Sequence, residues 1–400
     1  MKVIQINCVY PQGSTGELVQ GIHNCLKEQG VASKILYGRG PRVVDPDARK
    51  LCPEICAKAN NLFSRIRGTM YGGCFPETEL LIRILKKEKP DVVHLQCING
   101  YFVNIYKLVR LLKESGIPTV LTLHAEFMYT ANCAHSMDCM QWQTGCKQCS
   151  RWRQETLSWF RDGTSRSFEK MRNAFSGFEE RLTVVSVSPW LRERASRSRI
   201  LGGMDHRVIL NGVDTEIFCW QPPGEGKKKQ IVFFAAPVIS DAPDHPKGGA
   251  VLLEMAKRMQ DVRFVAAGTP EIKGDMPPNV TLLGIIRDRA QMARWYRTSD
   301  VTLLTSRRET FSMVCAESLC CGIPVVGYAA GGPESVCLPF GSTFVPWGDA
   351  DALEAALRRQ LAQPVDNQTL ARAAGERYSR KRMGQEYLAL YREVLHEAAP

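Results

Sequence analysis

The sequence predicts an α/β protein with mostly parallel strands. Short apolar runs rich in Val, Ile and Leu alternate with longer amphipathic stretches, as in strands joined by crossover helices. The alternation continues over 400 residues, more chain than one small core needs, and 44% of the residues are hydrophobic. We therefore expect two doubly wound domains in tandem, facing each other across a cleft that binds ligand at the carboxyl ends of the strands.

The first expected strand starts close to the N-terminus, where Gln5 and Asn7 alternate with isoleucines. This alternation is unlike the apolar core of a signal peptide, and no run of about 18 apolar residues is present to span a bilayer. We expect a cytoplasmic protein. In the first half the expected strands are 2–7, 33–38, 91–96, 118–124, 182–187 and 206–210, and the expected helices include 77–88, 104–115 and 165–176.

The segment 222–229 combines turn-forming residues with a run of lysines and precedes a fresh apolar strand. It divides the chain into an expected first domain, 1–220, and a second domain, 221–380. The first includes a cysteine-rich loop at 130–150. The final segment, 381–400, has apolar residues at helical spacing and is expected to pack back on the first domain. The expected strands of the second half are 231–236, 262–267, 279–284, 300–304, 323–327 and 343–346.

Glu309 and Glu317 form the most informative local pattern in the chain. They lie eight residues apart around an expected helix at 311–321, so a rise of ~1.5 Å per residue separates the carboxylates by roughly 10 Å. The free N–H groups of the first helical turn lie between them and suit an anion. A nucleoside-diphosphate sugar has this layout, with hydroxyls at both ends and two phosphates between. The alternative is a surface glutamate followed by an ordinary helical one.

Three further residues are candidates for a ligand site. Gly16 belongs to a glycine-bearing loop between the first strand and a helix expected from Glu17, where backbone can approach a phosphate. Lys247 precedes a glycine pair at a helix start and can meet a diphosphate as a point charge. His124 ends an apolar strand and is expected in the cleft. The alternatives are a plain turn, a solvated lysine and a structural histidine; His94, within a buried strand, we interpret as structural.

The cysteine-rich loop contains Cys133, Cys139, Cys146 and Cys149 within seventeen residues. Four thiolates in a polar loop can enclose one structural zinc ion in tetrahedral geometry, which leaves no open position for catalysis. Free thiols and redox chemistry are the alternatives. Most of the fifteen cysteines are expected to be reduced and to act as small core residues.

The formal net charge of +11 favours an anionic partner. No motif that reads DNA or RNA is visible, and the basic residues are dispersed apart from clusters at 192–199 and 227–229. We therefore expect no nucleic acid partner and favour peripheral association with an acidic membrane surface.

Taken together, these features resemble a bacterial glycosyltransferase of family 4, which implies the GT-B fold of two Rossmann-like domains. The strongest match runs from Glu309 to Glu334, and the resemblance covers nearly the full chain. Supporting matches are the loop at 13–16, His124, residues 211–214 and Lys247. The cysteine loop looks like the branch that builds colanic acid and other exopolysaccharides of the cell envelope.

The resemblance implies a retaining, metal-independent transfer of a hexose from a UDP- or GDP-sugar to a lipid-linked oligosaccharide at the inner face of the plasma membrane. The leaving diphosphate would take the acceptor proton, so the protein would contribute positioning and electrostatics. The matching catalytic positions are His124, Glu309 and Lys247. The matching donor-binding positions are Gly16, Phe311, Ser312, Met313 and Glu317.

In the roles that the resemblance implies, Glu309 and the amides after it hold the donor sugar, and Glu317 holds the ribose. Lys247 would neutralise the diphosphate, and His124 would contact the transferred sugar. Gly16 would approach the phosphate from the other domain.

Two positions depart from the family pattern. No arginine lies between Ile231 and Lys247, where members usually carry one, and Ala125 replaces an aspartate, with Glu126 next to it. The missing cation motivates an alternative of another class, a catalytically weak nucleotide-sugar-binding partner subunit of another glycosyltransferase. An epimerase or a phosphorylase ranks last, since nothing indicates a pyridoxal-phosphate lysine.

Overall fold

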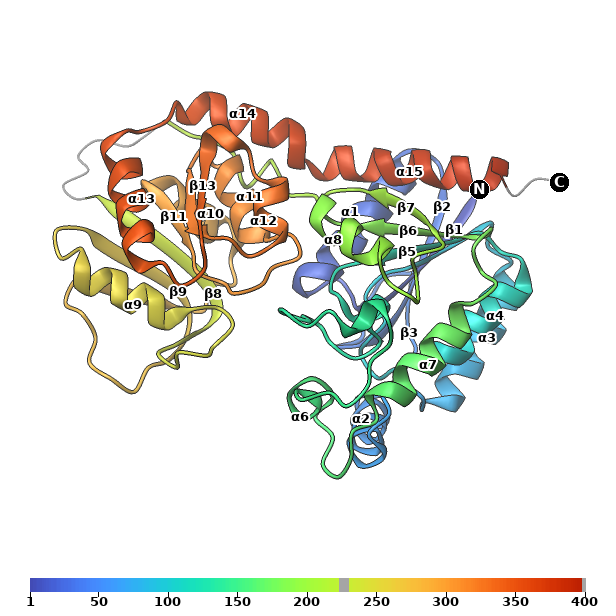
Figure 1. Ribbon diagram of the computed structural model, residues 1–400. Coiled ribbons are helices and arrows are strands. Elements are labelled where there is room, and N and C mark those ends of the chain that lie inside the picture. Colours follow the sequence, from blue (N-terminus) through green and yellow to red (C-terminus); the bar gives the residue numbers. More distant parts are fainter. Residues whose placement is uncertain (223–229, 398–400) are drawn as a thin grey trace. The chain divides into compact units, whose positions relative to one another are not determined.

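The computed structural model describes residues 1–222 and 230–397, which form two compact units (Figure 1). Unit 1 contains Met1–Leu210 and the chain from Met383 onward, and unit 2 is Asn211–Arg382. The predicted boundary segment, 222–229, lies outside the described residues except for Pro222. The division falls at residue 210 because the next residues bond within unit 2: Val213 N donates to Tyr378 O at 2.6 Å.

Unit 1 is built on a seven-stranded parallel sheet of order β3-β2-β1-β4-β5-β6-β7. The strands are β1 (Lys2–Val9), β2 (Ala32–Arg39), β3 (Ala48–Lys50), β4 (Val92–Leu95), β5 (Thr119–Leu123), β6 (Leu182–Ser186) and β7 (Asp205–Val208). The helices are α1 (Gly13–Glu28), α2 (Glu54–Arg67), α3 (Phe75–Glu88), α4 (Ile105–Ser115), α5 (Phe127–Thr130), α6 (Trp152–Thr156), α7 (Thr164–Phe175) and α8 (Pro189–Ser196). Strand β3 was not predicted, because three residues are too few to show a periodic pattern.

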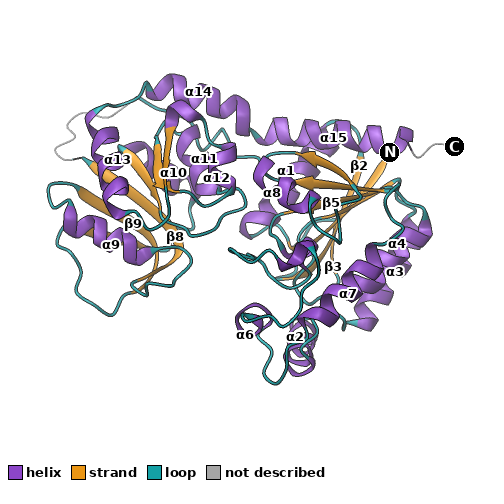
Figure 2. Ribbon diagram, viewed as in Figure 1, coloured by secondary structure: helices purple, strands orange, loops and turns teal. Residues whose placement is uncertain are grey.

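The last helix, α15 (Arg380–Glu397), packs on unit 1 beside α1, while α3, α4 and α7 cover the other face of the sheet (Figure 2). Its apolar residues join the core formed by α1 and the central strands; they are Met383, Tyr387, Leu388, Leu390, Tyr391 and Val394. His94 is fully buried beneath α15 and bonds Tyr391 Oη at 2.6 Å and Thr122 Oγ1 at 2.7 Å. His94 is therefore a structural residue, as interpreted from the sequence.

Unit 2 is built on a six-stranded parallel sheet of order β10-β9-β8-β11-β12-β13. The strands are β8 (Ile231–Ser240), β9 (Arg263–Glu271), β10 (Val280–Gly284), β11 (Val301–Leu304), β12 (Val325–Tyr328) and β13 (Ser342–Val345). The helices are α9 (Gly249–Arg258), α10 (Arg289–Thr298), α11 (Met313–Cys320), α12 (Gly332–Val336), α13 (Ala350–Ala362) and α14 (Asn367–Tyr378). The predicted α/β class with two parallel, doubly wound sheets is confirmed.

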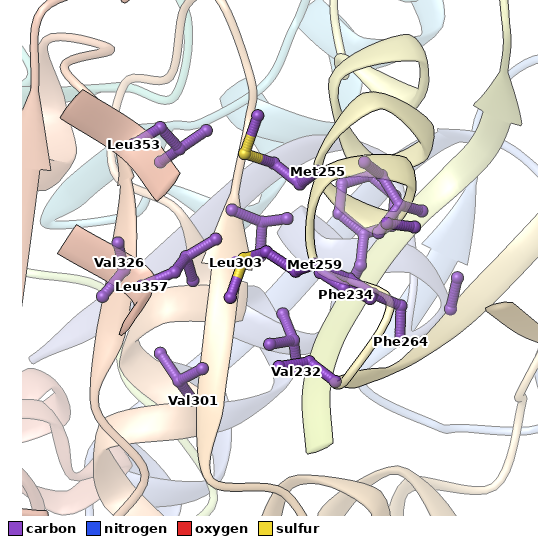
Figure 3. Close-up of a cluster of buried hydrophobic side chains, with 14 of the residues drawn as sticks. Val232, Phe234, Met255, Met259, Phe264, Val301, Leu303, Val326, Leu353 and Leu357 are labelled. Carbon is purple, nitrogen blue, oxygen red and sulfur yellow. The ribbon is translucent and has the colours of Figure 1, made fainter. Parts of the chain in front are cut away.

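Aliphatic and aromatic side chains from one face of β8 and its neighbouring strands form a core cluster of unit 2 with α9 and α13 (Figure 3). Val232 and Phe234 of β8 pack against Met255 and Met259 near α9, and Leu303 of β11 lies beside them. Strand β8 runs to Ser240, four residues beyond its predicted end, because it resumes pairing with β9 after a register shift between Ala235 and Val238. None of the described helices is both long and apolar enough to cross a bilayer.

Candidate functional site

Three loops of unit 2 meet at the carboxyl ends of the adjacent strands β8, β11 and β12. Thr305, just after β11, donates through its hydroxyl to Lys247 O at 2.9 Å and Gly248 O at 2.8 Å, which joins the loop after β8 to the loop after β11. Glu309 N donates to Ala330 O at 3.0 Å, which joins the latter to the loop after β12. The three loops therefore form one hydrogen-bonded platform where ligands of doubly wound sheets bind.

Gly248 and Gly332 are required for this close approach. Gly248 has φ +67°, and a Cβ there would lie 2.2 Å from Thr305 O. A Cβ on Gly332 would lie 2.3 Å from Thr310 O. Both distances are shorter than van der Waals contact, so side chains at these positions would push the loops apart.

The platform brings together two residues predicted for the site. Lys247 Nζ lies 2.5 Å from Glu309 Oε1, and the two side chains are 33% and 16% exposed. A charge-assisted bond of this length holds the lysine and the carboxylate beside the start of α11. In this structure the cation and the carboxylate neutralise each other.

Helix α11 begins at Met313, two residues later than predicted. Ser312 has φ +75°, which is not helical, and its Oγ caps the helix by accepting from Cys315 N at 3.4 Å. Phe311 is buried with its ring 6.3 Å from that of Tyr378, so its side chain belongs to the core. The N–H groups of the first turn of α11 lie next to Glu309 in the chain and are a place for an anion.

Glu317 lies on α11 with a side chain that is 14% exposed. Two residues of α10 face it: Tyr296 donates to Glu317 Oε2 at 3.3 Å, and Arg289 Nη2 lies 3.6 Å from Glu317 Oε1. Burial raises the pKa of Glu317 to about 7, and the Arg289 charge partly opposes this rise. At neutral pH the group is therefore divided between its acid and its carboxylate. Arg289 and Tyr296 were not predicted to contact Glu317. Arg289 could have been found from the sequence as a cation at the start of the helix that follows β10.

In unit 1, His124 follows β5 and Gln96 follows β4. His124 Nε2 bonds Gln96 Oε1 at 3.0 Å, and Gln96 Nε2 donates to Gln5 Oε1 at 2.8 Å. Because the Gln96 amide nitrogen is engaged with Gln5, the Gln96 oxygen accepts a hydrogen bond from the Nε2–H group of His124. Burial lowers the pKa of His124 to about 4. The imidazole is thus neutral at neutral pH, with its proton on Nε2.

Gly16 lies inside the first turn of α1, which begins at Gly13 rather than at the predicted Glu17. It is buried, and a Cβ there would lie 3.0 Å from the carbonyl carbon of Pro11. The absence of a side chain therefore lets the first turn of α1 pack against the strand-to-helix loop.

Both halves of the chain match models of protein families. Residues 18–217, half of the chain, match the family described as Glycosyltransferase Family 4. This chain belongs to glycosyltransferase family 4. Residues 230–363 match the family described as Glycosyl transferases group 1. The family predicted from the sequence is confirmed.

Full-length relatives of this family 4 glycosyltransferase agree with that assignment. The chain is 24% identical to WcaC of Escherichia coli K12, a glycosyl transferase assigned to colanic acid biosynthesis, over 98% of this chain and 100% of WcaC. Sucrose-phosphate synthase of Thermosynechococcus elongatus has a TM-score of 0.69 at 17% identity, over 99% of this chain and 100% of that one. Anabaena HepE in complex with UDP has a TM-score of 0.63 at 14% identity, over 98% and 100%. The fold of the chain is GT-B.

Glu126, the carboxylate next to Ala125, is engaged with partners inside unit 1. It is fully buried and bonds Arg194 at 3.2 Å, with further bonds from the hydroxyls of Tyr129 and Ser136. These partners come from α8, α5 and the start of the cysteine-rich loop. Glu126 therefore anchors the loop to unit 1.

The cysteine-rich loop does not form a gathered thiol cluster in this structure of the glycosyltransferase. Across residues 1–222 and 230–397, one group of at least three His, Cys, Asp or Glu residues has its ligand atoms within 4.8 Å of one another, namely His23, Asp45 and Asp47. Burial is the largest cause that raises the pKa of Cys133, and it raises that of Cys146 to about 12. Neighbouring thiols of the loop add to both shifts, and zinc binding stays a prediction.

Proposed function

We propose that this family 4 protein is a retaining, metal-independent hexosyltransferase. It takes the sugar from a UDP- or GDP-sugar and extends a lipid-linked polysaccharide at the inner face of the plasma membrane. The observation that carries the proposal is the Lys247–Glu309 pair beside the first turn of α11, which places a cation, a carboxylate and N–H donors together. The relationship to WcaC favours a polysaccharide product, and the complexes of HepE with UDP and UDP-glucose favour a nucleotide-sugar donor.

Donor binding would exchange the partners of the ion pair. The diphosphate would take Lys247 and the first-turn amides of α11, and Glu309 would then accept hydrogen bonds from hydroxyls of the hexose. Glu317, eight residues along the chain, would accept from the ribose hydroxyls. These contacts fix the anomeric carbon and spread the negative charge of the leaving group over fixed donors.

In the transfer step, the bond from the anomeric carbon to the diphosphate oxygen breaks. The acceptor oxygen bonds that carbon on the same face, and its proton passes to the departing diphosphate. His124 would stay neutral, with its Nε2–H group donating a hydrogen bond to Gln96, and its ring would face the transferred sugar. Gly16 would let backbone of unit 1 approach the phosphate. No protein nucleophile is needed.

A second candidate is a nucleotide-sugar-binding subunit with weak activity of its own. It is favoured by the lack of arginine between Ile231 and Lys247. The isolated chain distinguishes the two functions, because the subunit would bind donor without transferring the sugar.

The proposed function is tested by screening UDP- and GDP-sugars for thermal stabilisation of the purified chain and then measuring sugar transfer and donor hydrolysis. Ligand bound to the folded state raises the melting temperature by mass action. We expect Lys247→Ala and Glu309→Ala to abolish transfer. Lys257→Ala and Glu376→Ala, at exposed positions of α9 and α14, are the matched controls and should keep it. Full activity of the Lys247 and Glu309 variants would overturn the assignment.

A further inference from the structure

A pocket of unit 1 combines apolar walls with several cations. Its cavity volume is about 570 Å³, and its walls come from α2, the start of α3, the segment before α7, and α7 itself. Phe63 of α2 and Phe75 of α3 are its large apolar residues. Its basic residues are Arg67, Arg161, Arg166 and Lys170, against one carboxylate, Glu77. We call this cavity the amphipathic pocket.

The amphipathic pocket opens on the main exposed apolar surface of the described chain. The described chain has fifteen exposed large apolar side chains, and eight of them lie in two segments around the pocket, 55–75 and 157–160. They are Ile55, Leu62, Phe63, Ile66, Phe75, Leu157, Trp159 and Phe160. Phe160 is 72% exposed and Phe63 is 58% exposed. An apolar group of this size on a surface indicates a binding face.

The two segments are fixed to each other and form one surface. Arg65 O, near the end of α2, accepts from Trp159 N and from Ser158 Oγ, both at 3.0 Å. Gly163 packs so closely against Gly68 that a Cβ would lie 1.6 Å from Gly68 O. In Figure 1, α2 and the segment that carries α6 lie side by side at one end of unit 1. The apolar side chains therefore share a common support.

Among the described residues, no carboxylate pairs with the cations of the pocket. Within residues 1–222 and 230–397, Arg67, Arg161, Arg166 and Lys170 make no ion pair within 4.0 Å, although Lys170 lies 5.7 Å from the ring of Tyr106. Burial, followed by the charges of Arg166 and Arg67, lowers the pKa of Lys170. The repulsion among these cations would be relieved by an anion in the pocket.

We propose that the amphipathic pocket seats the phosphate of an anionic lipid and thereby docks unit 1 on a bilayer. The surrounding aromatic and aliphatic side chains would enter the headgroup and acyl boundary, as apolar faces of peripheral proteins do. Cations inside a cavity with an apolar rim match a phosphate that carries hydrocarbon chains. A free phosphate offers nothing to the rim.

The pocket lies at the functional edge of the sheet of unit 1. Helix α2 follows β3, and the segment with Arg161 follows β5 and His124, so both emerge from carboxyl ends of strands. Docking there would hold this edge near a lipid-linked acceptor. In that respect the inference rests on the proposed function.

The test is sedimentation of the full chain with vesicles of phosphatidylcholine alone or with about one third phosphatidylglycerol, at a physiological ionic strength. We expect binding to the anionic vesicles only. Two variants should each weaken it at least tenfold: Arg166→Glu with Lys170→Glu, and Phe63→Ser with Phe160→Ser. The matched controls are Lys257→Glu with Arg359→Glu, and Ile285→Ser with Phe340→Ser, at exposed sites of unit 2. They should bind as the unmodified chain does.

Three results with the variants would overturn the docking proposal. They are binding that survives in both pocket variants, equal losses in the controls, and a loss confined to the charge variant, which would mean adsorption without insertion. Displacement by inorganic phosphate at constant ionic strength would also overturn it, in favour of a free anion. Stabilisation by UDP is measured on every variant: it reports folding, and it tests the donor site of unit 2 separately from docking.

Discussion

Lys247 Nζ and Glu309 Oε1 are 2.5 Å apart although 62 residues separate them in the chain. The loops after β8 and β11 carry them, and those strands are neighbours in the sheet. Each side chain is therefore already bonded to the other, and a bound donor would have to replace that bond with its own contacts. This makes the pair a direct probe of donor binding.

We expect the pair to matter more for binding than for stability. Both side chains are partly exposed, so their mutual attraction should stabilise the free protein by at most about 1 kcal/mol. A charge-assisted bond to a diphosphate is stronger, so Lys247→Met should weaken UDP binding by about tenfold or more. Calorimetric titration with UDP, together with urea unfolding, measures both effects. A large loss of stability with unchanged UDP affinity would mean a structural ion pair.

Glu317 should make stability depend on pH. Its folded pKa of about 7 lies above its usual value of 4.5, so the folded state favours the protonated acid. The resulting stabilisation is complete below pH 4.5 and is lost as the pH rises through 7. Glu317→Gln keeps a neutral side chain, so its stability relative to the unmodified protein should rise by about 1–3 kcal/mol between pH 4.5 and 8. Urea unfolding across this range measures the difference. A constant difference would show that the carboxyl titrates normally.

His124 should make stability depend on pH in the direction opposite to that of Glu317. Burial places its folded pKa at about 4, below the usual 6.5, so the neutral ring stabilises the fold above pH 6.5 and this stabilisation is lost as the pH falls towards 4. We expect the His124 ring signals in NMR spectra to stay those of the neutral imidazole down to pH 5, with the proton on Nε2. His396, at the end of α15, serves as the reference ring in the same spectra. A midpoint near 6.5 for His124 would contradict the buried setting.

Most of the fold could be predicted from the sequence because its strands are short, apolar and buried. Candidate site residues could then be found at the carboxyl ends of these strands without knowledge of contacts. It could not reveal contacts between distant segments. The 3.2 Å pair of Glu126 and Arg194 joins residues 68 positions apart, and nothing local marks it. The start of α11 depends on the positive φ of Ser312, and a serine in the sequence does not indicate a positive φ. Strand β8 continues past Pro237 because the register shift accommodates it.

Tyr391 should contribute to stability through His94. Its hydroxyl bonds His94 Nδ1 at 2.6 Å in a fully buried site. Tyr391→Phe leaves that nitrogen without this partner, and we expect a loss of about 1–2 kcal/mol in the free energy of unfolding. Tyr328→Phe, at a buried ring of unit 2, is the control and should cost less. Equal effects of the two substitutions in urea unfolding would show that the bond to His94 adds nothing.

The cysteine-rich loop should bind zinc if its four thiols can close around the ion. Protein purified without added zinc is then expected to hold about one equivalent, measured by elemental analysis. Cys146→Ser combined with Cys149→Ser should remove the metal and lower the melting temperature, because binding of the ion is coupled to folding of the loop. Cys219→Ser, at a half-buried cysteine of unit 2, is the control and should keep the metal. If the purified protein contains no metal and the double variant is equally stable, zinc does not hold the loop, and Glu126 with its hydrogen bonds to Ser136 does so instead.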